Sequence, residues 1–215
     1  MIKIETSIGY RIIQQWMQNN NMQPFAFQKK AWEAIHHQQS GIINAPTGCG
    51  KTFSVFIGTL IRYINEHPNS YRSNQNIGLQ LLWITPLRAL ATDIGKAMQT
   101  VISEIGLPWK IGIRNGDTTV QERANQRKNI PEILIITPES LHLLLAQKGY
   151  PDFFSTLQII AVDEWHELIG SKRGVQVELA LSRLKGITDI QNRTPLCVWG
   201  ISATIGNLEI AQQVL

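Results

Sequence analysis

The sequence predicts a single α/β domain in which helices flank a doubly wound, mostly parallel β-sheet. Its 215 residues are enough to bury one large core. Short, almost continuously apolar segments alternate with stretches in which apolar residues recur at helical spacing. Strands that are apolar throughout are typical of parallel sheets buried on both faces, and their alternation with helices indicates right-handed crossovers. The expected strands are residues 41–45, 79–85, 110–114, 133–137, 157–162 and 196–202.

Two of the predicted helices have apolar faces that would cover such a sheet. Polar residues dominate at 65–78 and 115–131, which we expect to be surface connections, the second of them with a solvated helix. Residues three or four apart share one face of a helix. The two apolar faces consist of Phe53, Phe56, Leu60 and Ile64 in the first helix and of Val177, Ala180, Leu181 and Leu184 in the second.

Composition and charge narrow the function very little. The chain is 43% hydrophobic and 17% charged, as ordinary globular domains are, and its net charge of +4 permits a phosphate-rich partner without requiring one. The two cysteines, Cys49 and Cys197, form neither a CxxC pair nor a zinc quartet, which fits a reducing compartment. Residues 1–16 lack the apolar core of a signal peptide, and no run approaches the ~18 apolar residues of a membrane helix. We therefore expect a soluble, cytoplasmic protein with no membrane partner.

Two of the expected strands end in the dipeptide Thr-Pro, at Thr85-Pro86 and at Thr137-Pro138. Threonine is a good helix N-cap, and proline is favoured at the first helical position. Each dipeptide therefore predicts a helix that starts at the carboxyl end of a strand. Ligands bind at that edge of open parallel sheets.

A glycine-rich segment follows the first expected strand and opens a helix. Glycines let successive backbone N–H groups turn toward a phosphate, and a helix N-terminus adds partial positive charge. In this pattern Lys51 would reach the β- and γ-phosphates of ATP, and the Thr52 hydroxyl would bind Mg²⁺. The alternative is a chance glycine-rich turn between a strand and a helix. The segment reads Ala45-Pro46-Thr47-Gly48-Cys49-Gly50-Lys51-Thr52, which is GxxxxGK[ST] with alanine in the first glycine position.

A second buried strand ends in two adjacent acids, Asp163 and Glu164. Neighbouring carboxylates repel each other and are costly to desolvate, a cost that a cation between them and a triphosphate would offset. Asp163 would hold Mg²⁺, and Glu164 would orient and deprotonate the attacking water. The alternative is a strand that simply ends in a solvated acidic turn. Trp165 is expected to be a packing residue.

With these residues in place, the chain resembles the superfamily 2 helicases, and within them the Lhr (large helicase-related) family, from about Pro24 onward. The string DEWHELIGSKRG, from Asp163 to Gly174, looks specifically Lhr-like. The resemblance rests on six motifs in the expected order and spacing. They are Phe25-Ala26-Phe27-Gln28 (the Q motif), residues 45–52 (motif I), residues 85–90 (motif Ia), Thr137-Pro138-Glu139-Ser140 (motif Ib), residues 163–166 (motif II, DExH) and Ser202-Ala203-Thr204 (motif III).

The resemblance implies the first RecA-like P-loop domain of a helicase that uses ATP and Mg²⁺. Beside Phe25, the amide of Gln28 would read the adenine edge. His166, together with the hydroxyls of Ser202 and Thr204, would couple the nucleotide state to the nucleic acid. The resemblance also implies ATP-dependent movement along single-stranded DNA in the 3′-to-5′ sense.

Nucleic-acid contacts also have a physical basis. Helices that begin at Pro86 and Pro138 would present free backbone N–H groups to strand phosphates. Arg88 opposes the helix dipole, and a bound phosphate would remove that cost. The alternative for each charge is a solvated surface position. The predicted contacts are Pro86, Arg88, Thr137, Ser140, the turn Gly116-Asp117-Thr118 where the family has a further strand-contacting segment, and Lys172 and Arg173 just past the DExH turn.

We expect residues 1–215 to be one RecA-like ATP-binding domain from the N-terminal part of a longer protein. The motifs of the second RecA-like domain are absent, and the amphipathic pattern at 208–215 lacks a helix stop signal. The isolated domain should therefore be nearly inactive. Two other functions fit the same phosphate contacts: an RNA helicase, and an interaction module that ATP switches without unwinding. A small-molecule P-loop kinase is disfavoured, because it needs neither the Ser-Ala-Thr strand end nor the paired Thr-Pro dipeptides.

Overall fold

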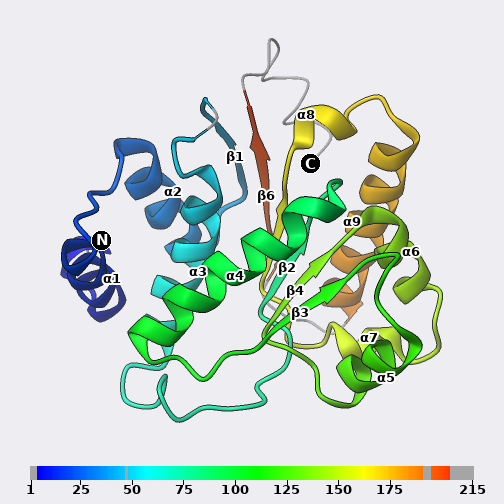
Figure 1. Ribbon diagram of the computed structural model, residues 1–215, viewed down its shortest axis with the longest axis horizontal. Coiled ribbons are helices and arrows are strands. Elements are labelled where there is room, and N and C mark those ends of the chain that lie inside the picture. The colour runs from blue at the N-terminus through cyan, green and yellow to red at the C-terminus, as the bar shows by residue number, and fades with distance from the viewer. Residues whose placement is uncertain (1–3, 47, 191–194, 204–215) are drawn as a thin grey trace.

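The computed structural model describes residues 4–46, 48–190 and 195–203. They form one six-stranded sheet covered by helices on both faces (Figure 1). Every pairing between strands is parallel. The strand order is β1-β6-β5-β2-β4-β3. The strands are β1 (Gly41–Asn44), β2 (Leu81–Ile84), β3 (Ile111–Arg114), β4 (Ile133–Ile136), β5 (Ile159–Val162) and β6 (Cys197–Ser202).

All six expected strands are confirmed, and each observed strand lies within its expected segment. The boundaries move inward by up to two residues, because the flanking residues leave the ladder to enter turns. The helices are α1 (Ile8–Asn19), α2 (Ala26–His36), α3 (Lys51–Glu66), α4 (Arg88–Ile105), α5 (Val120–Lys128), α6 (Pro138–Leu145), α7 (Tyr150–Phe153), α8 (Trp165–Leu168) and α9 (Lys172–Ile190), with a 3₁₀ turn, η1, at Ile4–Thr6.

Two apolar layers hold the sheet. One face packs against α1 to α4, and the other packs against α6 to α9, the helices at the left and right of Figure 1. Side chains of the central strands alternate between the two layers: Trp83 belongs to the first, and Leu82 and Ile84 to the second. The α9 face predicted from helical spacing is buried in the second layer.

The two Thr-Pro dipeptides behave differently. Thr137 caps α6, its side chain accepts a hydrogen bond from the backbone N–H of Ser140, and Pro138 is the first helical residue, as predicted. The prediction for Pro86 is wrong, because α4 begins at Arg88 with Leu87 as its N-cap. The Thr85 hydroxyl instead accepts a hydrogen bond from Leu87 N–H at 3.4 Å, which turns the chain two residues before the helix.

Several expectations concern the remaining parts of the chain. Both Cys49 and Cys197 are free thiols, as expected. Within the described ranges, no helix has the length and apolarity needed to cross a lipid bilayer. The expected helix at 208–215 lies outside the described residues, as do Thr47 and Thr204.

Candidate functional site

The parallel sheet brings the predicted site residues to one edge. Because all strands run in the same direction, their carboxyl ends share this edge, and β6 lies between β1 and β5. The register pairs Asn44 with Ser202, and Val162 with Gly200. The loop after β1 and the acids after β5 therefore lie on either side of Ser202. The helices that follow β1 and β5 cover opposite faces of the sheet, α3 one and α8 the other, and ligands bind at such a switch point in doubly wound sheets.

The glycine-rich loop leads directly into α3. Gly48 has φ 80° and Gly50, the N-cap of α3, has φ 70°, both in the left-handed region that favours glycine. These angles turn the loop back over the start of α3, where the first N–H groups of the helix have no intrahelical acceptor. At these two positions the backbone before α3 thus has angles that residues other than glycine adopt rarely.

Lys51 lies folded into the loop. Its ammonium group donates hydrogen bonds to the carbonyl oxygens of Ala45 at 2.7 Å and Pro46 at 2.9 Å, and the side chain is buried. Carbonyl oxygens neutralise a buried ammonium only in part. A phosphate close to the loop would compete with these carbonyls for the same cation.

Gln28 joins α2 to the phosphate loop. Its Oε1 accepts from Phe25 N–H at 2.9 Å, and its Nε2 donates to the Gly50 carbonyl at 3.0 Å. The amide is buried, yet it keeps a second Nε2 hydrogen and a second Oε1 lone pair. These are the donor and acceptor that recognition of an adenine edge needs. Phe25 is 53% exposed as a residue, and its ring stacks on that of Phe27, with ring centroids 5.7 Å apart.

Asp163 is held at the end of β5 by two donors. Trp83 Nε1 donates to its Oδ2 at 3.3 Å, and Glu164 N–H donates to its Oδ1 at 3.0 Å. Burial, followed by the neighbouring Glu164 carboxylate, raises the pKa of Asp163 to about 6. The Lys51 charge acts in the opposite direction. The two effects that disfavour ionised Asp163 are those that a divalent cation would offset.

Glu164 has a left-handed backbone conformation, with φ 49°. Residues other than glycine rarely adopt this backbone conformation, and such backbone strain is concentrated at functional sites. It turns the chain sharply from β5 into α8. Trp165, the next residue, is fully buried, as the predicted packing role requires.

His166 lies between the acids and the last residue of β6. Its Nδ1 is 3.0 Å from the Ser202 hydroxyl and 3.4 Å from Glu164 Oε2. The predicted catalytic residue Glu164 and the predicted coupling residues His166 and Ser202 thus form one connected group. Thr204, predicted to act with Ser202, lies outside the described residues.

The residues present fit a Mg²⁺-bound triphosphate. Among the described side chains, no group of three or more His, Cys, Asp and Glu could hold a metal alone. Mg²⁺ usually takes one or two protein ligands and completes its shell with waters and substrate phosphates. Thr52, in the first turn of α3, and Asp163, directly after β5, are the predicted ligands of such an ion.

The other half of the edge carries the predicted nucleic-acid residues at the ends of β2, β4 and β3. Thr137 and Ser140 are buried, and their hydroxyls are 3.1 Å apart. They shape the N-terminus of α6, so their side chains are structural, and the backbone N–H groups of its first turn remain the part suited to a phosphate.

Arg88 and the turn after β3 lie together. The side chain of Arg88 is 56% exposed and lies 3.8 Å from Asp117, and its guanidinium covers Gly116 so closely that a Cβ there would overlap it. Thr118 orders the turn by accepting from Asn115 N–H at 2.9 Å. The structure thus brings together two segments that were predicted separately.

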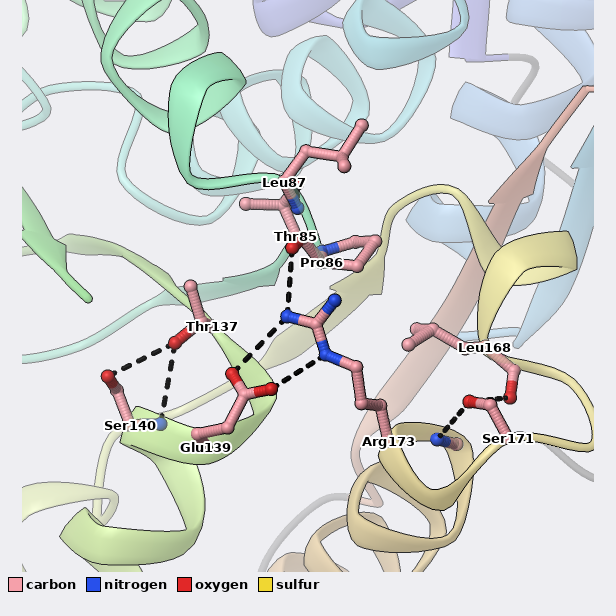
Figure 2. Close-up of polar contacts among 10 residues, drawn as sticks. Thr85, Pro86, Leu87, Thr137, Glu139, Ser140, Leu168, Ser171 and Arg173 are labelled. Atoms are coloured by element: carbon pink, nitrogen blue, oxygen red, sulfur yellow. Dashed lines mark hydrogen bonds and ion pairs between the residues drawn. The ribbon is translucent and has the colours of Figure 1, made fainter. Parts of the chain in front are cut away.

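Lys172 and Arg173 have different surroundings. Lys172 is exposed at the start of α9. Arg173 donates from Nε to Glu139 Oε1 at 2.7 Å and from Nη2 to the Pro86 carbonyl at 2.9 Å (Figure 2). Its predicted role as a free phosphate contact therefore competes with two protein partners.

Sequence reasoning missed two contacts between side chains near this edge. Trp83 lies on β2 and reaches Asp163 only because β2 is the neighbour of β5, and strand order is not visible in the sequence. Glu139 is in the motif Ib string, but its partner Arg173 is distant along the chain. An acid in the first turn of a helix is also explained by the helix dipole, so the position of Glu139 in the sequence did not indicate a partner.

A family model described as DEAD/DEAH box helicase matches residues 25–211. The Lhr helicase/uracil glycosylase of Escherichia coli (strain K12) is 32% identical over 201 residues, which is 88% of this chain and 13% of that protein. The ATP-dependent helicase Lhr-Core of Methanothermobacter thermautotrophicus is 32% identical over 191 residues, 85% of this chain and 21% of that protein.

Solved structures of helicases are also similar to this chain. The Mycobacterium smegmatis helicase Lhr bound to ssDNA and AMP-PNP has a TM-score of 0.77 and 30% identity, covering 90% of this chain and 24% of that one. The DUF1998 helicase MrfA bound to DNA and AMPPNP has a TM-score of 0.79 and 26% identity, covering 95% and 27%. These likenesses confirm the RecA-like fold. The chain spans only 13% to 27% of the length of these relatives.

Proposed function

The chain belongs to the DEAD/DEAH box helicase family, and from this membership we propose that it is the ATP-binding domain of an Lhr-type DNA helicase. In this proposal ATP hydrolysis drives movement along single-stranded nucleic acid. The domain would work with a second RecA-like domain in the same protein, and residues 1–215 would be the first of the two.

One observation carries the proposal. The phosphate loop and the acids Asp163 and Glu164 lie on the two sides of β6, and the last residue of β6, Ser202, contacts His166. A nucleotide bound between the loop and the acids would therefore lie beside the hydrogen-bonded pair His166 and Ser202, which connects the acids to the end of β6. A simple nucleotide-binding protein needs the loop and the acids, but not this pair.

Each residue would have a distinct task in hydrolysis. The loop N–H groups and Lys51 would hold the β- and γ-phosphates, and Gln28 would recognise the base next to Phe25. Asp163 and Thr52 would bind Mg²⁺, which supplies positive charge against the charge developing on the phosphates. Glu164 would accept the proton of the attacking water. His166 and Ser202, with Thr204, would report the state of the site to the nucleic-acid side.

The nucleic acid would follow the other half of the same edge. The α6 N-terminus, Arg88, the turn at 116–118 and Lys172 offer contacts to phosphates, which carry no sequence information. The solved Lhr relative contains ssDNA, and this supports DNA as the strand. The resemblance to that family supports movement in the 3′-to-5′ sense. Phosphate contacts alone do not distinguish DNA from RNA.

A second domain is needed for full activity. Helicase-type ATPases complete their site with an arginine that stabilises the transferring phosphoryl group, a contribution of ~10³–10⁵ in rate. The isolated domain should therefore bind nucleotide weakly and turn it over very slowly.

The test uses the full-length protein that contains this domain. Its ATPase rate is measured without nucleic acid, with single-stranded DNA and with RNA of the same sequence. We expect strong stimulation by DNA, with unlabelled DNA displacing a labelled strand better than RNA does. A rate that neither strand changes would contradict the motor and favour an ATP-switched interaction module. Stimulation by RNA alone would identify an RNA helicase.

A further inference from the structure

Arg173 joins three elements at the edge of the sheet where the carboxyl ends of the strands lie. It is the second residue of α9, and its guanidinium reaches Glu139 in the first turn of α6 and Pro86 in the loop after β2 (Figure 2). The Nε–Oε1 distance is 2.7 Å, and Nη2 lies 2.9 Å from the Pro86 carbonyl and 3.3 Å from Glu139 Oε2. The planar fork of arginine donates to both partners at once, which a lysine ammonium does less well.

A short, well-anchored corner connects Arg173 to the DExH turn. In the tight turn between α8 and α9, the Ser171 hydroxyl donates to the Leu168 carbonyl at 2.7 Å and accepts from Gly174 N–H at 3.0 Å (Figure 2). Leu168 is fully buried, as is Trp165. A Cβ at position 174 would overlap the Leu168 carbonyl, so the backbone segments of this corner are closely packed. A shift of the DExH turn must therefore carry the start of α9 with it.

The partners of Arg173 belong to the two loops proposed to hold the strand. The Pro86 carbonyl precedes Arg88 by two residues, in the loop that leads into α4. Glu139 lies between the capping residue Thr137 and Ser140. One side chain thus fixes the start of α6 relative to the loop after β2, and holds both relative to the DExH turn.

Stability alone does not account for this arrangement. The side chains of Arg173 and Glu139 are 39% and 45% exposed, and exposed ion pairs contribute little to folding. Partial burial acts to raise the pKa of Glu139, but the Arg173 hydrogen bond and charge outweigh it, so that the pKa is lowered. Glu139 is thus ionised at neutral pH and places a negative charge beside a surface proposed for phosphates. That charge opposes strand binding unless it serves to hold Arg173.

We propose that Arg173 is a positioning residue that couples the ATP site to the nucleic-acid loops through Glu139 and the Pro86 carbonyl. It acts on the strand only through these partners. The inference rests on the proposed function, because it requires a nucleic acid on these loops. Breaking the pair should leave both sites intact and weaken the communication between them.

The primary variant is Glu139→Ala in the full-length protein. Variants along a coupling network change the coupling by roughly two- to thirtyfold, and we expect the DNA-stimulated kcat of ATP hydrolysis to fall within that range. The basal ATPase rate and the KM for ATP without DNA should stay unchanged. Glu178→Ala on α9, whose side chain has no hydrogen bond or ion pair with the described residues, removes the same charge and should leave all of these values unchanged.

Arg173→Lys distinguishes positioning from direct phosphate contact. Lysine keeps the charge but not the fork, so positioning predicts a loss of stimulated turnover similar to that of Glu139→Ala, with an unchanged salt dependence of DNA binding. A direct contact predicts nearly normal DNA affinity for Arg173→Lys and tighter DNA binding by Glu139→Ala, since an opposing charge is removed.

The outcomes separate cleanly. Loss of stimulated kcat in both variants, with unchanged basal rate and salt slope, supports the inference. Normal stimulated turnover in Glu139→Ala, or tighter DNA binding with stimulation retained, overturns it while the helicase function stands. A wild-type protein that DNA does not stimulate defeats the proposed function itself. Thermal unfolding of each variant, expected to match wild type, excludes a loss of fold.

Discussion

The Nδ1 atom of His166, on α8, lies 3.0 Å from the hydroxyl of Ser202 at the end of β6. Glu164 Oε2 lies 3.4 Å from the same nitrogen. Glu164, the residue proposed to activate water, and Ser202, the last residue of β6, therefore both lie beside the same nitrogen of His166. In the proposed function, this geometry couples the nucleotide state to the rest of the domain.

Ser202→Ala should uncouple ATP hydrolysis from the nucleic acid without preventing ATP binding. The substitution removes the hydroxyl that contacts His166, while the loop and the acids remain. We expect near-normal ATP binding with lower DNA-stimulated ATPase and unwinding in the full-length protein. A cycle of Ser202→Ala, His166→Ala and the double variant measures the interaction, and the effects should be non-additive. Strictly additive losses would mean that the two residues act separately.

Lys51→Ala should abolish ATP hydrolysis. In the described part of the loop, Lys51 is the one cationic side chain, and it is already placed against Ala45 and Pro46. Removing one electrostatic stabiliser typically costs about 10²–10³ in kcat. Steady-state ATPase of the full-length protein checks this. Turnover above about a tenth of wild type would count against the loop assignment.

Glu164→Gln should bind Mg²⁺-ATP normally and fail to hydrolyse it. The amide keeps the shape of the side chain but cannot accept a proton from water. Fluorescent-nucleotide titration and single-turnover hydrolysis separate the two properties. If binding disappeared together with turnover, Glu164 would be a metal-binding or structural residue instead.

Arg88→Ala combined with Lys172→Ala should weaken single-stranded DNA binding evenly across sequences. Both side chains are exposed at the edge, and the one ion pair of Arg88 with a described residue is the 3.8 Å approach to Asp117. Each lost phosphate contact should lower the salt slope by roughly 0.7 for a single strand. Anisotropy titrations at several salt concentrations measure this, with ATP affinity in the absence of DNA as the control. An unchanged slope and affinity would return both residues to the status of solvated charges.

Gly174→Ala and Gly186→Ala form a matched pair on α9. A Cβ at position 174 would overlap the Leu168 carbonyl oxygen, whereas a Cβ at position 186 meets open space. We expect Gly174→Ala to destabilise the domain by about 1–3 kcal/mol through overpacking. Gly186→Ala should stabilise it by about 0.5–1 kcal/mol, because alanine loses less backbone entropy in a helix. Chemical denaturation of the domain checks both signs. Equal effects of the two changes would mean that the α8–α9 corner is looser than the geometry indicates.

The sequence alone determined the parts of this protein that depend on neighbouring residues. Nearly continuous apolar runs identified all six strands, because the strands of a sheet covered on both faces carry mostly apolar side chains. The glycine spacing before Lys51 and the acids after β5 predicted the candidate nucleotide site, because both are local chemical patterns.

Only the tertiary structure decided which distant residues meet. It brought Trp83 to Asp163 and Arg173 to Glu139, and it moved the start of α4 from Pro86 to Arg88. Strand order and the packing of helices across the sheet set these contacts. Each of them depends on where two separate segments lie in space, and the residues around either segment alone carry no information about that distance.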